Sequence, residues 1–275
     1  YKNKKLDYLW TPFENYNKLT KQNVTIAGVA VTKKDLNSTS KTKFIASAAN
    51  SVFEELSVIG VSHETYDSAK QISEATVTLT DSHSDLFNML ASFEKYSNDI
   101  LKHSIAVSVL SVLIAKEMKW KNKLSLEKLS LGGILHDIGK MALPTSLVDK
   151  PIAHMSPEER QIYESHPFKG MEMVTSLGVV PDDVTAIIYQ HHENAIGLGY
   201  PRKIRDLKMH PLAKVVALAD QFVSLTIKTS SHPKPMKMAD AVLYIENIMG
   251  QPFNKECFKA LKIIILKESV KNIAS

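Results

Sequence analysis

Histidine and aspartate stand side by side in GGILHDIGK (132–140), at the end of a segment with helical apolar spacing. His136 and Asp137 offer an imidazole and a carboxylate, which are ligands for Fe, Mn or Zn. Adjacent helical residues diverge by about 100°, so His136 could bind one ion while Asp137 reaches a second. The alternative is an ordinary helix end, in which Gly139 stops the helix and Lys140 complements its dipole.

Two further residues with ligand chemistry lie within apolar helical segments. His103 is surrounded by apolar residues at helical spacing, where a lone histidine is usually an ordinary core residue. Asp99 lies one turn earlier and could orient His103 or bind a metal itself. Asp220 interrupts LAKVVALADQFVSL (212–225), and a buried carboxylate is costly unless it is paired or coordinated. A buried salt bridge or a helix cap is the alternative for Asp220.

Three more histidines stand at predicted helix ends. His166 precedes Pro167, which permits a helix from that proline onward and places His166 at the junction. Capping is the alternative role for His166. His191 and His192 are consecutive at the end of another predicted helix, where a solvated terminus is the alternative. Together the candidates supply five imidazoles and two or three carboxylates, enough for two metal ions that share one carboxylate.

Sequence patterns divide the chain into two parts that must position these side chains. NVTIAGVAV (23–31) is β-branched and partly alternating, which predicts a strand, whereas 43–60 has the apolar spacing of a helix. We therefore expect a small α/β domain over residues 1–80, with a regulatory or dimerisation role. Residues 81–275 show almost only helical patterns and predict an all-α bundle, so the protein as a whole should be mainly α.

The helices expected in and before this bundle follow from apolar spacing and from proline and glycine at their ends. They cover residues 62–82, 85–118, 125–140, 156–165, 167–178, 181–192, 210–228, 237–250 and 254–269. The first of them should connect the two parts of the chain.

Composition limits the function further. The hydrophobic fraction of 44% and charged fraction of 23% are ordinary for a globular protein, and no apolar run reaches the length of a membrane span. The single cysteine, Cys257, excludes an internal disulfide and a cysteine-rich zinc site. We see no secretory leader and no arginine-rich stripe for nucleic acid. A cytoplasmic protein that binds neither membrane nor DNA is therefore expected, and the net charge of +5 mildly favours an anionic ligand.

Four stretches together resemble one known family. HDIGK, ALPTSLVDKP, SPEERQIYESHPFKGMEMV and HHENAIGLGYP are similar, in this order, to the HD-GYP subfamily of HD-domain metal-dependent phosphohydrolases. The resemblance runs from about residue 95 to 225 and does not include the N-terminal part. It implies an HD-type helical bundle and a bacterial signalling hydrolase, a phosphodiesterase that opens cyclic di-GMP to linear pGpG or to GMP.

The resemblance also implies a ligand set for a binuclear centre. One ion would be held by His103, His136, Asp137 and Asp220, and the second by Asp137, His166, His191 and His192. The family usually binds iron and sometimes manganese, and the ligand chemistry also admits zinc. Family members commonly carry a glutamate at the position of Asp99, linked to a third ion, and the shorter aspartate makes a third ion doubtful here.

A catalytic arrangement follows from the same resemblance. A hydroxide bridging two cations about 3.5–4 Å apart is a nucleophile at neutral pH, with Asp137 as the shared ligand. Lys140 would add a fixed positive charge and contact the substrate. Gly197 and Gly199 would let a loop come close to the ligand. Tyr200 and Pro201, which follow them, would contact a guanine or a ribose.

Three departures from the family pattern leave alternatives open. Ile196 and Val223 occupy positions where the family usually has aspartate, and TSSH (229–232) replaces an Arg-Pro-Tyr stretch. The basic residues that grip the dinucleotide are thus missing, unless one or more of Lys228, Lys234 and His232 substitute.

The complete ligand set favours an active phosphodiesterase. The missing basic residues, which would weaken binding of the dinucleotide, favour either of two alternatives. One is a sensor or interaction module that binds cyclic di-GMP or a GGDEF-type diguanylate cyclase without efficient turnover. The other is a phosphohydrolase for another nucleotide. A homodimer formed through the N-terminal part is a further expectation.

Overall fold

The structure is a computed structural model that describes residue 12 and residues 15–82, 99–230 and 232–274. Its α-helices are α1 (Tyr16–Thr32), α2 (Ser38–Ile59), α3 (His63–Ser82), α5 (Asp99–Glu117), α6 (Lys123–Leu135), α7 (Thr145–Val148), α8 (Pro157–Tyr163), α9 (His166–Thr175), α10 (Asp182–Gln190), α11 (Pro211–Thr226), α12 (Met238–Leu243) and α13 (Lys255–Ala274). Shorter turns are η3 (Ile138–Ala142), η4 (Ile152–His154), η5 (Asp206–Lys208) and the π-helical η6 (Tyr244–Ile248). None of the described helices is long and apolar enough to span a membrane.

The expected mainly α architecture is confirmed, but the α/β character of the N-terminal part is wrong. The predicted strand at 23–31 lies inside α1, and the described residues contain no strand beyond one isolated bridge between Ile196 and Arg205. The buried positions Val24, Ala27 and Val31 recur every three or four residues. The apolar residues therefore fit a helical face as well as an alternating one, and packing on α2 and α3 selects the helix.

The helices predicted at 43–60 and 62–82 are present as α2 and α3. Asn37 caps α2 by accepting a hydrogen bond from the Ser40 amide at 2.8 Å, so this helix begins five residues before the predicted start. Gly60 ends it with a φ of 84°. The first part of the helix predicted over 85–118 falls on residues 83–98, which lie outside the described residues.

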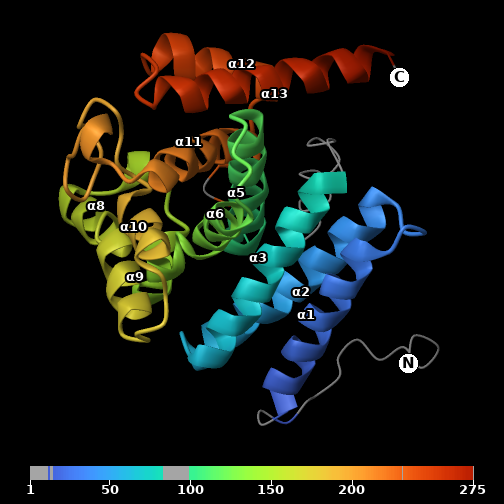
Figure 1. The fold of residues 1–275 in the computed structure, drawn as a ribbon. Coiled ribbons are helices and arrows are strands. Elements are labelled where there is room, and N and C mark those ends of the chain that lie inside the picture. The colour runs from blue at the N-terminus through green and yellow to red at the C-terminus, as the bar shows by residue number, and fades with distance from the viewer. Residues whose placement is uncertain (1–11, 13–14, 83–98, 231, 275) are drawn as a thin grey trace.

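Helix α3 lies between the N-terminal helices and the rest of the molecule, packing on α1 and α2 on one side and on α5 and α6 on the other (Figure 1). One continuous apolar core runs from Val24 in α1 to Ile265 in α13. The boundary at residue 80 remains a prediction.

The centre of the helical part is formed by α5, α6 and α11. Helix α5 is buried on nearly all sides from Leu101 to Val112, as its all-round apolar sequence requires. Gly133 of α6 lies directly against α5, because a Cβ there would be 2.6 Å from the Cα of Ser108. The glycine thus allows the two helices to cross closely.

The end of α6 differs from the prediction that one helix continues to residue 140. The α-helix ends at Leu135, and the chain tightens into the 3-10 turn η3 after Asp137, whose φ and ψ are −95° and 8°. This change of backbone direction leaves His136 at the C-cap of α6 and Asp137 at the N-cap of η3.

Candidate metal centre

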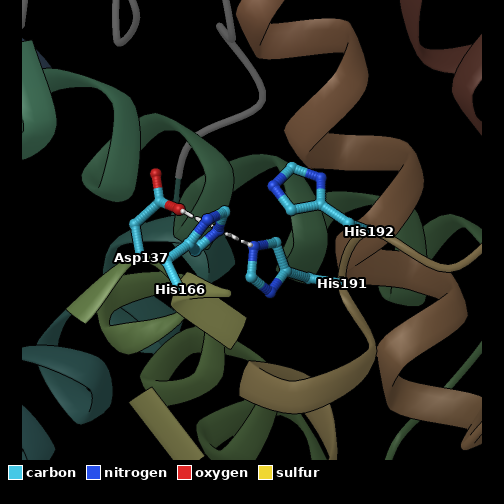
Figure 2. A group of neighbouring side chains, drawn as sticks. All are labelled: Asp137, His166, His191 and His192. Atoms are coloured by element: carbon cyan, nitrogen blue, oxygen red, sulfur yellow. Dashed lines mark hydrogen bonds and ion pairs between the residues drawn. The ribbon is translucent and has the colours of Figure 1, made fainter. Parts of the chain in front are cut away.

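The structure brings all seven side chains predicted as metal ligands into one buried cluster. Their ligand atoms form two groups, each with its atoms within 4.8 Å of one another. The first group consists of His103, His136 and Asp220, and the second, shown in Figure 2, of Asp137, His166, His191 and His192. The cluster could bind metal, and its membership matches the set implied by the family resemblance.

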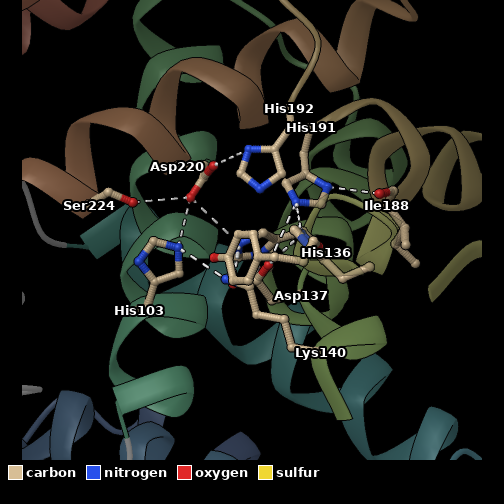
Figure 3. A network of polar contacts seen from close by, with 12 residues as sticks. His103, His136, Asp137, Lys140, Ile188, His191, His192, Asp220 and Ser224 are labelled. Atoms are coloured by element: carbon tan, nitrogen blue, oxygen red, sulfur yellow. Dashed lines mark hydrogen bonds and ion pairs between the residues drawn. The ribbon is translucent and has the colours of Figure 1, made fainter. Parts of the chain in front are cut away.

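Helix ends and two central helices supply the cluster. His136 and His191 occupy the C-caps of α6 and α10, and His166 is the first residue of α9. His103 and Asp220 lie within α5 and α11. Segments from widely separated parts of the sequence therefore meet at one point (Figure 3).

Asp137 points one carboxylate oxygen toward each group. Its Oδ2 is 3.4 Å from His136 Nε2 and 4.0 Å from His103 Nε2. Its Oδ1 is 3.2 Å from His166 Nε2 and 3.6 Å from His191 Nε2. This is the arrangement that a carboxylate needs to bridge two ions.

Asp220, a member of the first group, also lies close to His192 of the second group. Its Oδ1 accepts a hydrogen bond from His103 Nε2 at 2.8 Å and lies 3.8 Å from His136 Nε2. Its Oδ2 is 3.5 Å from His192 Nδ1. For His103 to bind metal through Nε2, its ring proton must move to Nδ1.

Three of the histidines are oriented in the same way. The Nδ1 of each donates to the backbone carbonyl three residues earlier, at 2.7 to 2.8 Å. The pairs are His136 with Gly133, His166 with Tyr163 and His191 with Ile188. Because a carbonyl only accepts, Nδ1 carries the proton, and in the neutral ring Nε2 presents a lone pair to the cluster.

The Nε2 lone pairs of these histidines face one another, and no proton lies between them. The Nε2 atoms of His166 and His191 are 3.1 Å apart, although both Nδ1 protons are already engaged. The buried Nε2 of His136, Nε2 of His192 and Oδ1 of Asp137 have no hydrogen-bond partner. A cluster of buried bare nitrogen and oxygen atoms facing one another is relieved by a cation, so the residues fit a divalent metal.

Burial sets the protonation of the second group. It lowers the pKa of His166 to about 4 and also lowers those of His191 and His192. Burial alone would raise the pKa of Asp137, but the charge of Lys140 beside it holds that pKa well below its usual range. At neutral pH this group therefore offers neutral imidazoles and an ionised carboxylate, the forms that bind metal.

The metal-free protein is expected to lose stability as the pH falls from about 6.5 to about 4. In this window unfolded His166 binds a proton that the folded residue, with a pKa of about 4, does not. The unfolded state binds more protons, so the free energy of unfolding rises with pH, by on the order of 3 kcal/mol from this residue alone. Urea unfolding of chelator-treated protein at several pH values measures it, and a flat profile between pH 6.5 and 4.5 would contradict the burial of neutral His166.

Lys140 lies at the cluster, as the sequence predicts. Its Nζ donates to Asp137 Oδ2 at 2.6 Å and sits 5.4 Å from the centre of the Tyr163 ring. Burial alone would lower its pKa, but Asp137 raises it, so the ammonium stays charged. Lys140 therefore fixes the Asp137 carboxylate and adds a positive charge beside it.

The loop with the Gly-x-Gly-Tyr-Pro sequence packs against the cluster. Gly197 has a φ of 78°, and a Cβ on Gly199 would lie 2.3 Å from the carbonyl oxygen of His192. The Tyr200 ring stacks on the His192 imidazole, with centroids 4.5 Å apart, and the Tyr200–Pro201 bond is cis. Both glycines thus serve contacts within the protein, and their roles toward substrate remain predictions.

Sequence reasoning missed Glu193, which follows the histidine pair directly. Its side chain is buried, and its carboxylate accepts hydrogen bonds from the amides of Arg202 at 2.6 Å and Ile204 at 3.0 Å. The only signal in the sequence is the acidic residue in the order His-His-Glu, which gives no indication of its partners.

The residues at the departures from the family pattern belong to neither group of candidate ligands. Asp99 belongs to neither group, because its carboxylate is engaged by Lys102 and by the amide and hydroxyl of Ser230. Val223 is fully buried, Ile196 is half exposed, and the lysines considered as substitutes are exposed. Those lysines are Lys228 and Lys234.

The HD-domain sequence family matches residues 65–256. The chain belongs to the HD-domain family. The resemblance seen in HDIGK and in the stretches that follow it is thereby confirmed. The matched part of the HD domain begins within α3, so the family region includes the helix that joins the N-terminal helices to the rest.

Two curated relatives carry names of cyclic dinucleotide hydrolases. Cyclic di-GMP phosphodiesterase PA4108 of Pseudomonas aeruginosa is 30% identical over 158 residues, covering 58% of this chain and 37% of that protein. The 3'3'-cGAMP-specific phosphodiesterase 3 of Vibrio cholerae is 27% identical over 173 residues, covering 58% of this chain and 34% of that protein. The HD-domain chain thus spans little more than a third of the length of either relative.

A solved structure shares the fold across the HD domain and beyond it. Bd1817, a HDG"Y"P protein from Bdellovibrio bacteriovorus, superposes with a TM-score of 0.75 over 92% of this chain and 81% of that one, at 23% identity. The shared fold therefore extends past the residues that the family matches.

Proposed function

We propose that this HD-domain chain hydrolyses a phosphodiester bond of cyclic di-GMP, giving linear pGpG or GMP, at a centre of two divalent metal ions. The observation that carries the proposal is the position of Asp137, with one oxygen facing each histidine group. Similarity to a relative named as a cyclic di-GMP phosphodiesterase supports the substrate. A net charge of +5 suits an anionic ligand of this kind.

Each residue of the cluster has a definite part in this proposal. His103, His136, Asp137 and Asp220 would hold one ion, and Asp137, His166, His191 and His192 the other. Bound divalent ions supply a water-derived nucleophile at neutral pH and neutralise charge on the phosphoryl oxygens.

The backbone carbonyls keep the imidazole Nε2 atoms directed inward, and Lys140 holds Asp137 in its bridging position. Lys140 also places a permanent cation where negative charge grows on the substrate.

Iron is the proposed metal, with manganese next. The cluster contains imidazoles and carboxylates, and Cys257 is buried in the core outside it, so no thiolate selects zinc. Neither group includes Asp99, which supports two ions rather than three.

The test is product formation under conditions that keep iron reduced. The protein is loaded with Fe(II) or Mn(II) without oxygen and incubated with cyclic di-GMP, 3'3'-cGAMP and cyclic di-AMP, and the products are separated by chromatography. We expect pGpG or GMP from cyclic di-GMP, abolished by chelation. Absence of product from every nucleotide, despite bound metal, would overturn the proposal.

A second candidate is a protein that keeps the metal centre but either binds cyclic di-GMP without efficient turnover or hydrolyses another cyclic dinucleotide. It is favoured by Ile196 and Val223 at family aspartate positions, and by the similarity to a relative named for 3'3'-cGAMP. Cleavage of 3'3'-cGAMP alone, or tight binding of cyclic di-GMP without product, would select this candidate.

Replacing Lys140 with methionine is expected to lower the turnover of cyclic di-GMP by about 10²-fold, because a positioned charge beside the reacting phosphate is lost. Methionine replaces the aliphatic part of the side chain and removes only the charged group, whose effect should be largest in the transition state, so KM should change less than kcat. Lys169→Met is the matched control, since the Nζ of this half-buried lysine donates to the backbone carbonyl of Ala142 at 3.2 Å and not to a residue of the cluster. Equal rates for both variants would show that Lys140 has no part in the reaction.

A further inference from the structure

His192 is the one histidine of the second group without a backbone anchor for its ring. The Nδ1 atoms of His166 and His191 donate to carbonyls three residues earlier, whereas Nδ1 of His192 faces Asp220 Oδ2 at 3.5 Å. Its Nε2 is buried without a hydrogen-bond partner. Another contact must therefore fix the direction in which this imidazole points.

That contact is the ring of Tyr200. The two rings are stacked, with centroids 4.5 Å apart and an angle of 30° between their planes. The His166 ring meets His192 edge-on at 4.9 Å. The imidazole is thus held between a parallel tyrosine and a perpendicular histidine, which restricts rotation about its side-chain bonds.

The backbone around Tyr200 is in turn tied to the end of α10. The Tyr200 amide donates to the carbonyl of His192 at 3.1 Å, and only glycine fits at Gly199, where a Cβ would lie 2.3 Å from the same carbonyl oxygen. The tyrosine therefore belongs to a loop that folds back onto the residue whose ring it covers.

Glu193 closes this loop on its other side. The side chain is 1% exposed, and its two oxygens accept hydrogen bonds from the amides of Arg202 and Ile204, just after the Tyr200–Pro201 bond. A buried carboxylate satisfied by backbone amides acts as a fixed anchor for the loop.

We infer that Glu193 and Tyr200 are positioning residues for the second metal ion, which act by setting the orientation of the His192 ring. The inference rests on the proposed metal centre, but not on the reaction or its substrate. It assigns the Gly-x-Gly-Tyr-Pro loop a role inside the protein. Loss of either residue should weaken the ion held with His166 and His191, and leave the ion at His103 and His136 bound.

The experiment is a titration of the protein with Mn(II) alone, in which electron paramagnetic resonance measures the free and the bound metal. Wild type should bind two ions. Tyr200→Leu removes the stacking and should weaken one ion by about 10- to 100-fold, the usual effect of losing an outer-shell partner of a ligand. Tyr200→Phe keeps the ring and should restore near-wild-type binding. Glu193→Ala should resemble Tyr200→Leu, and Glu193→Gln, which retains one acceptor oxygen, should lie between.

Tyr189→Leu is the matched control, because Tyr189 lies on α10 against Phe168 and outside the loop. It should bind two ions like wild type. If Glu193→Ala fails to fold, the two Tyr200 variants still decide the question.

Equal binding by Tyr200→Leu and wild type, or equal weakening of both ions, would overturn the positioning role. Wild-type protein that binds two Mn(II) ions but cleaves no cyclic dinucleotide would overturn the proposed reaction alone.

Discussion

Replacing Asp137 with asparagine is expected to abolish one ion and nearly all hydrolysis. The carboxylate has one oxygen 3.4 Å from His136 Nε2 and the other 3.2 Å from His166 Nε2. An asparagine amide has one neutral oxygen, so it cannot offer a negatively charged ligand atom to each group. We expect kcat to fall by about 10³-fold or more, which corresponds to about 4 kcal/mol of lost transition-state stabilisation. Product formation and Mn(II) stoichiometry are measured on the same preparation.

Asp183→Asn provides the control for this change. Asp183 lies in the first turn of α10 and pairs with Lys128 and His210, neither of which belongs to the cluster. Its loss should cost a fraction of a kcal/mol of stability and leave both ions and the rate intact. An Asp137→Asn protein that keeps two ions and a tenth of the wild-type rate would show that the carboxylate does not bridge.

Replacing Gly139 with alanine is expected to destabilise the protein severely. A Cβ at this position would lie 2.0 Å from the carbonyl oxygen of His166 and 2.5 Å from the amide nitrogen of Gly170. Both are backbone atoms, so η3 and α9 must separate to admit the methyl group. We expect the free energy of unfolding to fall by about 3 kcal/mol, measured by urea denaturation of metal-free protein.

Gly28→Ala is the matched substitution. Gly28 lies inside α1, and a Cβ there would meet no atom within 4 Å. Alanine should therefore stabilise the protein by about 1 kcal/mol through helix propensity. If Gly139→Ala were as stable as Gly28→Ala, the close approach of η3 to α9 would be wrong.

Two residues of the cluster stand out in the sequence because they are out of place in their segments, and the family resemblance supplies the others. A carboxylate at Asp220 or an imidazole at His103 is costly inside an apolar helix, and that cost singles the residue out from the sequence alone. The sharing of Asp137 between two ions is an expectation from the family resemblance, but the 3-10 turn after Leu135 that sets the direction of each oxygen could not be predicted.

Contacts between distant segments account for what the sequence did not reveal. Glu193 takes its partners from amides nine and eleven residues later, and nothing in its neighbours indicates them. In α1, the β-branched residues of 23–31 locally favour a strand, and burial of Val24, Ala27 and Val31 against other helices overrides that preference.

The neutral imidazoles have an electrostatic consequence for a loaded centre. Because His166, His191 and His192 have lowered pKa values, only the carboxylates oppose the charge of the incoming ions. Two divalent cations bound as proposed would therefore leave this region with a surplus of positive charge, to which Lys140 would add. With two ions bound as proposed, this charge would attract an anionic ligand and would compensate for the arginine missing from TSSH (229–232).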